Sequence, residues 1–387
     1  MKAGSRRCDA ALLTSSLRGG GAERVMVNLA NGMAARGYGV DFVLGRAHGP
    51  YLPEVSPRVD LVDFRTRRAL VGTFRLLRYL LARRPPVVLA SSVMCNVAVL
   101  LLRRLCRLST RVVVRVDVVM SKGSPLLNRD HMRCSASMRR VFAAVPRLYP
   151  LADAVIAVSE GVARDLADNF NVPRERILTI YNPVITPAIL KKAGEPPDHP
   201  WFAEDRPVVL AVGRLDRQKD YLTLLDAFAG VRAQRDARLL ILGEGPERKR
   251  LEARIFELRL GDDVQMPGFV ENPFACMKRA RVFVLSSAWE GLGNCLVEAM
   301  ACGCPVVSTD CPSGPAEILD NGRYGHLAEV GSSPQLAEAI VEVLDGRGRA
   351  APSSWLQRFS LDPAVEQHIA ALGLKHRDEA KACSSRD

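Results

Sequence analysis

The chain has 387 residues, about two to three times the usual size of one domain, so its length predicts two domains. Hydrophobic residues make up 48% and charged residues 25%, which excludes a disordered or collagen-like chain. The longest apolar runs, such as 97–102, are far shorter than the roughly 18 to 20 residues that a membrane-spanning helix needs. Asp9 interrupts the apolar run near the N-terminus, so we expect no signal peptide.

Charge is divided unevenly along the chain, although the whole has a net charge of +12. Residues 1–190 carry 29 Lys and Arg against 13 Asp and Glu, whereas the remainder carries 25 against 29. The first half is therefore expected to bind an anionic partner. The ten cysteines have no Cys-x-x-Cys spacing and no paired spacing with histidine, so we expect free thiols in a reducing cytoplasm.

Short apolar runs rich in β-branched residues alternate with helix-length segments, which is typical of parallel sheets with crossover helices. In the first half the predicted strands are 10–13, 40–44, 59–62, 87–90, 111–116, 154–158 and 177–180. After a proline-rich interruption the predicted strands are 208–212, 239–242, 264–266, 282–285 and 306–308. Two doubly wound α/β domains in tandem explain this pattern.

The domain boundaries follow from the proline-rich stretch, which contains Pro187, Pro196, Pro197 and Pro200. We predict an N-terminal domain over 1–183, a linker over 184–206 and a C-terminal domain over 207–355. A C-terminal helix and tail over 356–387 would pack back on the first domain.

The residues that follow the strands carry most of the functional information, because ligands bind at the carboxyl ends of strands in open α/β sheets. After the first strand comes Gly19-Gly20-Gly21-Ala22-Glu23-Arg24, which opens a helix over 25–35. Its glycines and the helix start suit a phosphate, or serve only as a tight turn. The loop lacks the third glycine of a dinucleotide fingerprint and the lysine of a P-loop.

Gly213 follows the first strand of the second half, and Arg214 and Lys219 come after it, before a helix over 221–232. Two cations in this place are able to clamp a diphosphate and neutralise the charge that grows on a departing phosphate. Solvated surface charges are the alternative. Farther along, Gly243-Glu244-Gly245 gives another strand end a turn that suits close approach of a ligand.

Two glutamates eight residues apart, Glu290 and Glu298, bracket Gly291, Gly293 and the start of a helix. Carboxylates accept hydrogen bonds from the vicinal hydroxyls of a sugar and a ribose, while backbone N–H groups hold phosphates. As the alternative, Glu290 is a helix cap and Glu298 a residue on the helix surface.

The stretch from Glu290 to Glu298 resembles the E-x7-E motif of glycosyltransferase family 4, the retaining, nucleotide-sugar-dependent enzymes of GT-B fold. The supporting segments occur in the expected order over nearly the whole chain: the Gly19–Arg24 loop, Tyr181-Asn182-Pro183, Gly213-Arg214-Leu215 with Gln218-Lys219-Asp220, Gly243-Glu244-Gly245, and Cys311–Ile318. The glycine loop and the Cys-Pro-Ser-Gly-Pro segment are most similar to bacterial members that build polysaccharides and lipid-linked oligosaccharides, including N-acetylgalactosamine transferases.

The resemblance implies a GT-B architecture, in which two Rossmann-like domains face a cleft, and a role for each matching residue. Arg214 and Lys219 would bind the donor diphosphate, Glu298 the ribose hydroxyls and Glu290 the transferred sugar. The donor-binding set would also include Gly20, Gly21, Gly213, Glu244, Gly291, Leu292, Gly293 and Asn294. The donor would be a nucleotide sugar, UDP-linked by expectation, with no metal and no other cofactor.

One first-domain position departs from the family pattern. Many members place a histidine beyond a first-domain strand, near the reacting face of the sugar, whereas this chain has Asp117, two residues after Arg115. We predict that Asp117 takes the catalytic position of that histidine. An ionised carboxylate accepts hydrogen bonds but does not donate them. His131 is the rival candidate.

Two basic segments give the first-half charge a candidate role. In 67–84 the apolar positions 70, 74, 77 and 81 form one helical stripe, with arginines elsewhere. The second segment combines Arg133, Arg139, Arg140 and Arg147 with Met138, Phe142 and Val145. Either stripe faces the core, or the segments rest on anionic lipid at the inner face of the cell membrane, where a lipid-linked or oligosaccharide acceptor would be.

Two other functions remain open at this point. A basic domain also suits nucleic acid, although zinc-finger spacing and RNP-like aromatic strands are missing and the glutamate pair would repel phosphates. A sugar-nucleotide 2-epimerase of the same architecture would need no acceptor. The sequence favours a retaining glycosyltransferase that transfers a hexose or N-acetylhexosamine to a growing bacterial polysaccharide or lipid-linked oligosaccharide.

Overall fold

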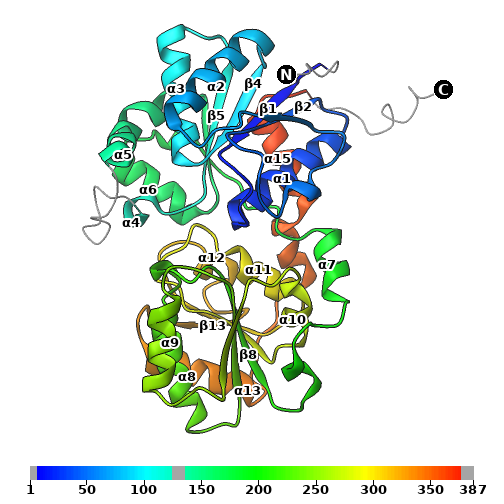
Figure 1. Cartoon of the computed structure of the whole chain (residues 1–387), viewed down its shortest axis with the longest axis vertical. Helices are drawn as coiled ribbons and strands as arrows, with labels where there is room; N and C mark the ends of the chain where they lie inside the picture. The colour runs from blue at the N-terminus through cyan, green and yellow to red at the C-terminus, as the bar shows by residue number, and fades with distance from the viewer. Residues whose placement is uncertain (1–6, 124–135, 376–387) are drawn as a thin grey trace, which may run out of the picture. The chain divides into compact units, whose positions relative to one another are not determined.

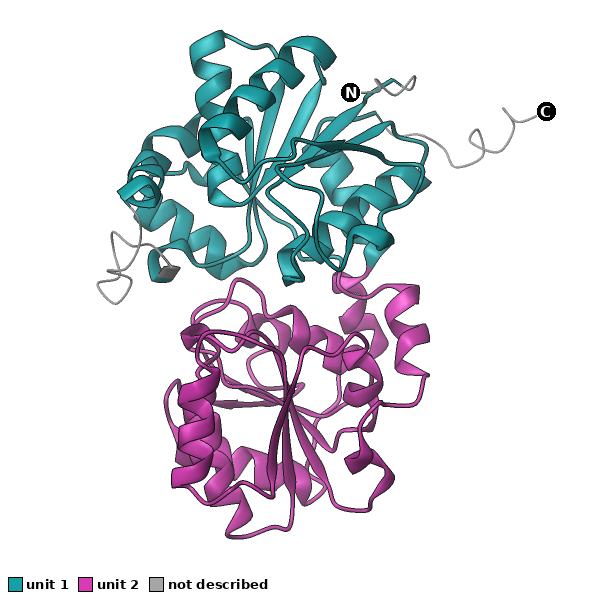
Figure 2. Cartoon of the chain, viewed as in Figure 1, with its two compact units in different colours: residues 1–183, 361–387 teal, residues 184–360 magenta. Residues whose placement is uncertain are grey.

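The computed structural model describes residues 7–123 and 136–375 (Figure 1). They divide into two compact units, which Figure 2 shows in different colours. Unit 1 comprises the described residues up to Pro183 together with those from Leu361 onward, and unit 2 comprises Val184–Ser360. Each unit contains one parallel sheet, so the predicted pair of α/β domains is confirmed.

The described part of unit 1 contains a seven-stranded parallel sheet in the order β3-β2-β1-β4-β5-β6-β7. Its strands are β1 (Ala10–Thr14), β2 (Val40–Leu44), β3 (Asp60–Asp63), β4 (Val87–Ser91), β5 (Arg111–Val116), β6 (Ala154–Ala157) and β7 (Ile177–Thr179). Its helices are α1 (Gly21–Ala35), α2 (Ala69–Arg83), α3 (Val93–Cys106), α4 (Met120–Gly123), α5 (Ala136–Leu148), α6 (Glu160–Phe170) and α15 (Leu361–Ala371). The direction of winding reverses between β1 and β4, which places the glycine loop at a topological switch point.

The sheet of unit 2 has the order β10-β9-β8-β11-β12-β13. Its strands are β8 (Val208–Val212), β9 (Arg238–Leu242), β10 (Val264–Gly268), β11 (Val282–Leu285), β12 (Val306–Thr309) and β13 (His326–Ala328). Its helices are α7 (Pro187–Ala193), α8 (Tyr221–Arg232), α9 (Arg248–Glu257), α10 (Pro273–Arg279), α11 (Asn294–Ala301), α12 (Pro315–Ile318), α13 (Ser333–Leu344) and α14 (Ser353–Leu356). The switch point lies between β8 and β11, the strands that precede Arg214 and Glu290.

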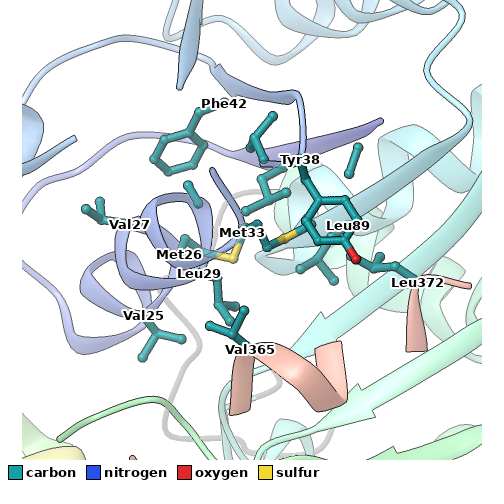
Figure 3. Close-up of a cluster of buried hydrophobic side chains, with 14 of the residues drawn as sticks. Val25, Met26, Val27, Leu29, Met33, Tyr38, Phe42, Leu89, Val365 and Leu372 are labelled. Atoms are coloured by element: carbon teal, nitrogen blue, oxygen red, sulfur yellow. The ribbon is translucent and has the colours of Figure 1, made fainter. Parts of the chain in front are cut away.

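Helix α15 packs on α1 in the core of unit 1. Val365 and Ile369 are buried with Met33 in one hydrophobic cluster, and Figure 3 shows Val365 beside Leu29. A Cβ at Gly32 would lie 2.6 Å from Cγ2 of Val365, so the absence of a side chain on α1 permits this close packing. Salt bridges from Arg36 to Asp362 and Glu366 add to the contact.

The segment 184–206 differs from the expected linker because it is largely structured. Thr186 caps α7 by accepting a hydrogen bond from the Ile189 amide, and a 3-10 helix covers Pro200–Ala203. Trp201 is 5% exposed, and Arg238 lies over its ring. This segment clusters with unit 2, whose boundary with unit 1 therefore falls after Pro183.

Helix α2 presents its apolar stripe to solvent, which overturns the core-facing interpretation for this helix. Leu70, Phe74 and Leu81 are 87%, 61% and 51% exposed. The core-facing positions are Leu76, Tyr79 and Leu80, shifted around the helix. The second basic segment behaves in the opposite way, since Val145 is fully buried on α5. Arg133 and His131 lie outside the described residues.

The described residues contain no helix that is long and apolar enough to span a membrane. All the cysteines within the described ranges have free thiols.

Candidate active site

The loop between β8 and α8 is shaped by glycines that allow neighbouring backbone segments to pack closely. A Cβ on Gly213 would lie 2.9 Å from Oη of Tyr221 and 3.0 Å from Cε of Lys219. A Cβ on Gly243, where φ is +147°, would lie 1.9 Å from the Gly213 carbonyl oxygen. The Gly243-Glu244-Gly245 turn therefore braces the Lys219 loop, a structural role beside the expected approach to a ligand.

Lys219 and Glu290 form the central contact of unit 2, with Nζ and Oε1 separated by 2.6 Å. The two side chains are only 15% and 8% exposed. Burial alone would lower the pKa of Lys219, but the charge of Glu290 and its hydrogen bond outweigh burial and raise that pKa. Lys219 is thus held as a cation, with further N–H donors available for an anion.

Three neighbours that sequence reasoning did not assign fix the orientation of this ion pair. Ser287 donates its hydroxyl to Oε1 of Glu290 at 2.7 Å, and the Gln218 amide donates to the Trp289 carbonyl at 3.0 Å. Ser286 Oγ donates to the Lys219 carbonyl at 2.7 Å. These contacts connect the ends of β8 and β11, which are neighbours only in the folded sheet.

Glu298 is a buried residue of α11, 9% exposed, so its interpretation as a helix-surface residue is wrong. Cys295 lies three residues before Glu298 on α11, the helix that follows Glu290, and the charges of Glu290, Glu298 and Lys219 all influence its thiol. Burial is the main reason that the pKa of Cys295 rises to about 12, so the thiol is neutral at physiological pH. Lys219, Glu290 and Glu298 therefore gather in one part of unit 2.

The loop from Gly291 to Asn294 packs against the segment that follows β12. Ser313 donates its hydroxyl to the Gly291 carbonyl at 2.7 Å, and a Cβ on Gly314 would lie 1.9 Å from the carbonyl oxygen of Leu292. Gly293 caps α11 with φ +96°, a conformation that other residues rarely adopt. Leu292 is 2% exposed and anchors the loop in the core.

Arg214 and Glu244 are more exposed and pair with residues that lie close to them in the sequence. The side chain of Arg214 is 72% exposed, and its Nε donates to Asp216 at 2.6 Å. Glu244 pairs with Arg248, whose hydrogen bond lowers the pKa of the carboxyl group. The structure thus places Arg214 near the Lys219 loop but does not bring it into contact with the buried pair.

In unit 1 the glycine loop has an internal cap at the start of α1. The backbone N–H of Gly20 donates to Oε2 of Glu23 at 2.6 Å. The Gly20 amide, which the sequence analysis expected to face a phosphate, is therefore already used by the Glu23 carboxylate. Gly20 is the residue directly before α1, which begins at Gly21. An incoming anion would compete with Glu23 for that donor.

Asp117 lies at the carboxyl end of β5 with its side chain 17% exposed. Its two oxygens have separate partners: Oδ1 accepts from Arg115, and Oδ2 accepts from the Ser91 hydroxyl at 2.8 Å. A second arm of Arg115 donates to the Asn182 amide oxygen at 2.5 Å. The carboxylate is therefore rigidly oriented.

Within residues 7–123 and 136–375, no group of three or more His, Cys, Asp and Glu is placed to hold a metal ion.

Solved structures share this fold along nearly the whole chain. The structure of Anabaena HepE in complex with UDP and glucose superposes with a TM-score of 0.74 at 21% identity, covering 94% of this chain and 99% of that chain. The apo form of the lipopolysaccharide outer core galactosyltransferase WaaB gives a TM-score of 0.68 at 20% identity, over 94% and 98% of the two chains. The fold is that of the GT-B glycosyltransferases.

Family models then make the assignment specific. The model "Glycosyltransferase Family 4" matches residues 19–186, and the model "Glycosyl transferases group 1" matches residues 197–354. These two ranges cover most of the chain, which therefore belongs to the family 4, group 1 glycosyltransferases.

Relatives by sequence include enzymes of bacterial glycan assembly. The chain is 35% identical over 198 residues to N-acetylgalactosamine-N,N'-diacetylbacillosaminyl-diphospho-undecaprenol 4-alpha-N-acetylgalactosaminyltransferase of Campylobacter jejuni, over 51% of this chain and 52% of the relative. It is 26% identical over 306 residues to the amylovoran biosynthesis glycosyltransferase AmsD of Erwinia amylovora, over 79% and 81%. The match to the Campylobacter relative thus spans about half the length of that protein.

Proposed function

We propose that this chain transfers a hexose or N-acetylhexosamine from a UDP-sugar to a lipid-linked oligosaccharide or growing polysaccharide, with retention at the anomeric carbon. The buried Lys219–Glu290 pair at the switch between β8 and β11 carries the proposal. Similarity to the Campylobacter N-acetylgalactosaminyltransferase and to HepE, whose structure contains UDP and glucose, supports this choice of substrates.

The pair has the right chemistry for both ends of a donor sugar diphosphate. One N–H of the Lys219 ammonium donates to Glu290, and its other N–H groups are able to bind a phosphate. The exposed Arg214, five residues earlier in the same loop, supplies a second cation. Together they neutralise the charge that grows on the departing UDP. Glu290 accepts from hydroxyls of the transferred sugar, and Glu298 accepts from those of the ribose.

Transfer proceeds through an oxocarbenium-like transition state. The bond from the anomeric carbon to the UDP oxygen breaks, and the acceptor oxygen forms its bond on the same face. The departing diphosphate takes the proton of the acceptor hydroxyl. In unit 1, Asp117 orients a hydroxyl group of the sugar or the acceptor, and Gly20 and Gly21 contribute to holding the diphosphate. The reaction as proposed requires no metal.

The enzyme acts at an anionic membrane surface in this proposal. Leu70, Phe74 and Leu81 are exposed on α2, while Tyr79 and Arg83 tie the opposite side of that helix to the buried Asp41. The outward face is therefore fixed by contacts with the sheet. Exposed apolar side chains surrounded by arginines are suited to insertion between anionic lipid headgroups. At that surface the enzyme would meet a lipid-linked acceptor.

A thermal-shift screen with UDP-glucose, UDP-galactose, UDP-N-acetylglucosamine and UDP-N-acetylgalactosamine tests the proposal. At least one should raise the Tm of the wild type, because a ligand that binds only the folded state stabilises it. Without ligand, Glu298→Ala should have the same Tm as the wild type, but the nucleotide sugar should no longer raise that Tm. No response to any nucleotide sugar, combined with a salt-sensitive shift of DNA, would favour nucleic-acid binding instead.

Product analysis separates transfer from epimerisation. The selected UDP-sugar is incubated alone and with a lipid extract that contains diphosphate-linked glycolipids. Transfer predicts UDP release that increases with the acceptor, whereas a 2-epimerase converts the donor alone into its epimer.

A further inference from the structure

The carboxylate of Glu290 uses its two oxygens unequally. Oε1 accepts from Nζ of Lys219 at 2.6 Å and from the Ser287 hydroxyl at 2.7 Å. Oε2 lies 3.4 Å from the amide nitrogen of Gln218, and that nitrogen has a closer acceptor in the Trp289 carbonyl at 3.0 Å. Because an ionised carboxylate has about two acceptor sites on each oxygen, Oε1 is fully used and Oε2 keeps acceptor capacity.

Lys219 supplies a charge but does not by itself orient this carboxylate. Its ammonium is a compact charge at the end of a flexible stem, and such a charge attracts either oxygen of a carboxylate. The torsion that turns a glutamate carboxylate is broad and has no strong intrinsic preference. A second contact on Oε1 is therefore needed to decide which oxygen joins the ion pair and which is left for a ligand.

Ser287 is placed to provide that second contact. It is fully buried, and its backbone carbonyl accepts from the Thr309 hydroxyl at 2.6 Å. Thr309 is the last residue of β12, the strand beside β11, and is itself fully buried. The Ser287 hydroxyl is therefore anchored from the neighbouring strand, and it donates to the carboxylate because an ionised carboxylate only accepts.

We propose that Ser287 is a positioning residue, which keeps Oε1 of Glu290 in the ion pair and thereby leaves Oε2 to accept from a hydroxyl of the transferred sugar. The remaining N–H groups of Lys219 then bind the diphosphate, so separate atoms of the pair bind the two ends of the donor. This inference rests on the proposed function, because Oε2 accepts from a sugar only if the chain binds one.

The experiment compares Ser287→Ala, which removes the hydroxyl, with Ser287→Thr, which retains it. The UDP-sugar selected by the thermal-shift screen is the probe, and its dissociation constant and the rate of UDP release are measured separately. Ser287→Ala should lower kcat/KM by about 10-fold to 100-fold, the range expected when a group at the reacting centre is displaced by up to about 1 Å. Ser287→Thr should recover most of that loss.

Ser308→Ala is the matched control. Ser308 is an equally buried serine on β12, and its hydroxyl donates to the Thr309 carbonyl at 2.9 Å. Both alanine variants remove one buried hydroxyl group, so they should lower Tm by similar amounts, whereas only Ser287→Ala should lower kcat/KM. Equal kcat/KM for the two variants would overturn the inference.

Deoxy analogues of the donor provide a measurement that a purely structural role of Ser287 would not change. Each analogue lacks one hydroxyl of the transferred sugar, and kcat/KM is determined with the wild type and with Ser287→Ala. For the analogue that lacks the hydroxyl bound by Oε2, Ser287→Ala should have a further effect of less than about twofold, because the interaction is already lost. The other analogues should show the full loss. An undiminished loss with every analogue would overturn the inference.

The outcomes for the inference and for the proposed function are distinguishable. If the wild type binds and turns over a UDP-sugar while Ser287→Ala matches it, only the positioning inference fails. If the wild type binds no nucleotide sugar at all, the proposed function fails and this inference falls with it.

Discussion

The two units use charge in opposite ways. In unit 2, Lys219 and Glu290 are buried against each other beside a topological switch point. In unit 1 arginines of α2 and α5, such as Arg75, Arg78, Arg139 and Arg140, are exposed, whereas Arg115 is fully buried. A buried pair is rigid and little screened by salt, so it suits chemistry that needs fixed charges, whereas exposed cations act through an extended surface. The difference separates the fixed, buried charges of unit 2 from the exposed basic surface of unit 1.

The largest expected effect is on turnover in unit 2. Lys219→Ala should lower kcat by about 100-fold to 1,000-fold, as removal of one preorganised stabiliser of a growing negative charge does in other enzymes. Steady-state UDP release measures it, and circular dichroism confirms that the variant is folded. Lys249→Ala, which removes an exposed lysine on α9 of the same unit, is the matched control and should be neutral. Near-normal turnover by Lys219→Ala would end the proposed role.

Loss of the partner carboxylate should affect folding as well as activity. Glu290→Gln leaves the largely buried Lys219 without its counter-charge, so the free energy of unfolding should fall by about 3 kcal/mol. Urea unfolding gives the value. Glu257→Gln breaks the exposed pair with Arg254 and should cost less than about 1 kcal/mol. Equal costs for the two variants would mean that the pair in unit 2 behaves as a surface pair.

The buried imidazole of His368 in unit 1 should make the free energy of unfolding depend on pH. The pKa of His368 is lowered from 6.5 to about 3, so the unfolded state binds its proton first as the pH falls. The free energy of unfolding should therefore be unaffected by this ring above pH 6.5. It should fall between pH 6.5 and about 3, by up to about 1.4 kcal/mol per pH unit. His368→Gln should flatten this part of the pH profile of urea unfolding. An identical slope for both proteins would show that the ring is not held neutral.

The smallest effect concerns the surface of unit 1. Phe74→Ser on α2 should weaken binding to vesicles that contain anionic phosphatidylglycerol by about fivefold, because about 1 kcal/mol of apolar burial is lost. Phe256→Ser removes a similarly exposed phenylalanine, 85% exposed, from unit 2 and should not change vesicle binding. Cosedimentation at low salt measures both. Equal effects, or no binding by the wild type, would remove the membrane from the proposal.

The sequence predicted the strands of both sheets well, since buried parallel strands are continuous apolar runs. It missed β13, whose sequence His-Leu-Ala contains no β-branched residue. The positions of Lys219 and Glu290 were predictable from strand ends, but their contact with each other was not, because 71 residues separate them. For the apolar stripe of α2 the sequence left two interpretations open, since periodicity identifies an apolar face without saying what covers it.

Arg115 shows a further limit of sequence reasoning. An arginine in a β-branched strand gives no sign that Asp117 and Asn182 will accept its hydrogen bonds, since Asn182 lies 67 residues farther along the chain. Such networks become visible only when the fold has brought their members together.

The most direct test of the central claim compares the binding of UDP and UMP by calorimetry, in the wild type and in Lys219→Ala. If the buried pair grips the diphosphate, the wild type should prefer UDP strongly, and Lys219→Ala should lose most of that preference while binding UMP almost as before. A UDP preference that is equally large in both proteins would contradict the account.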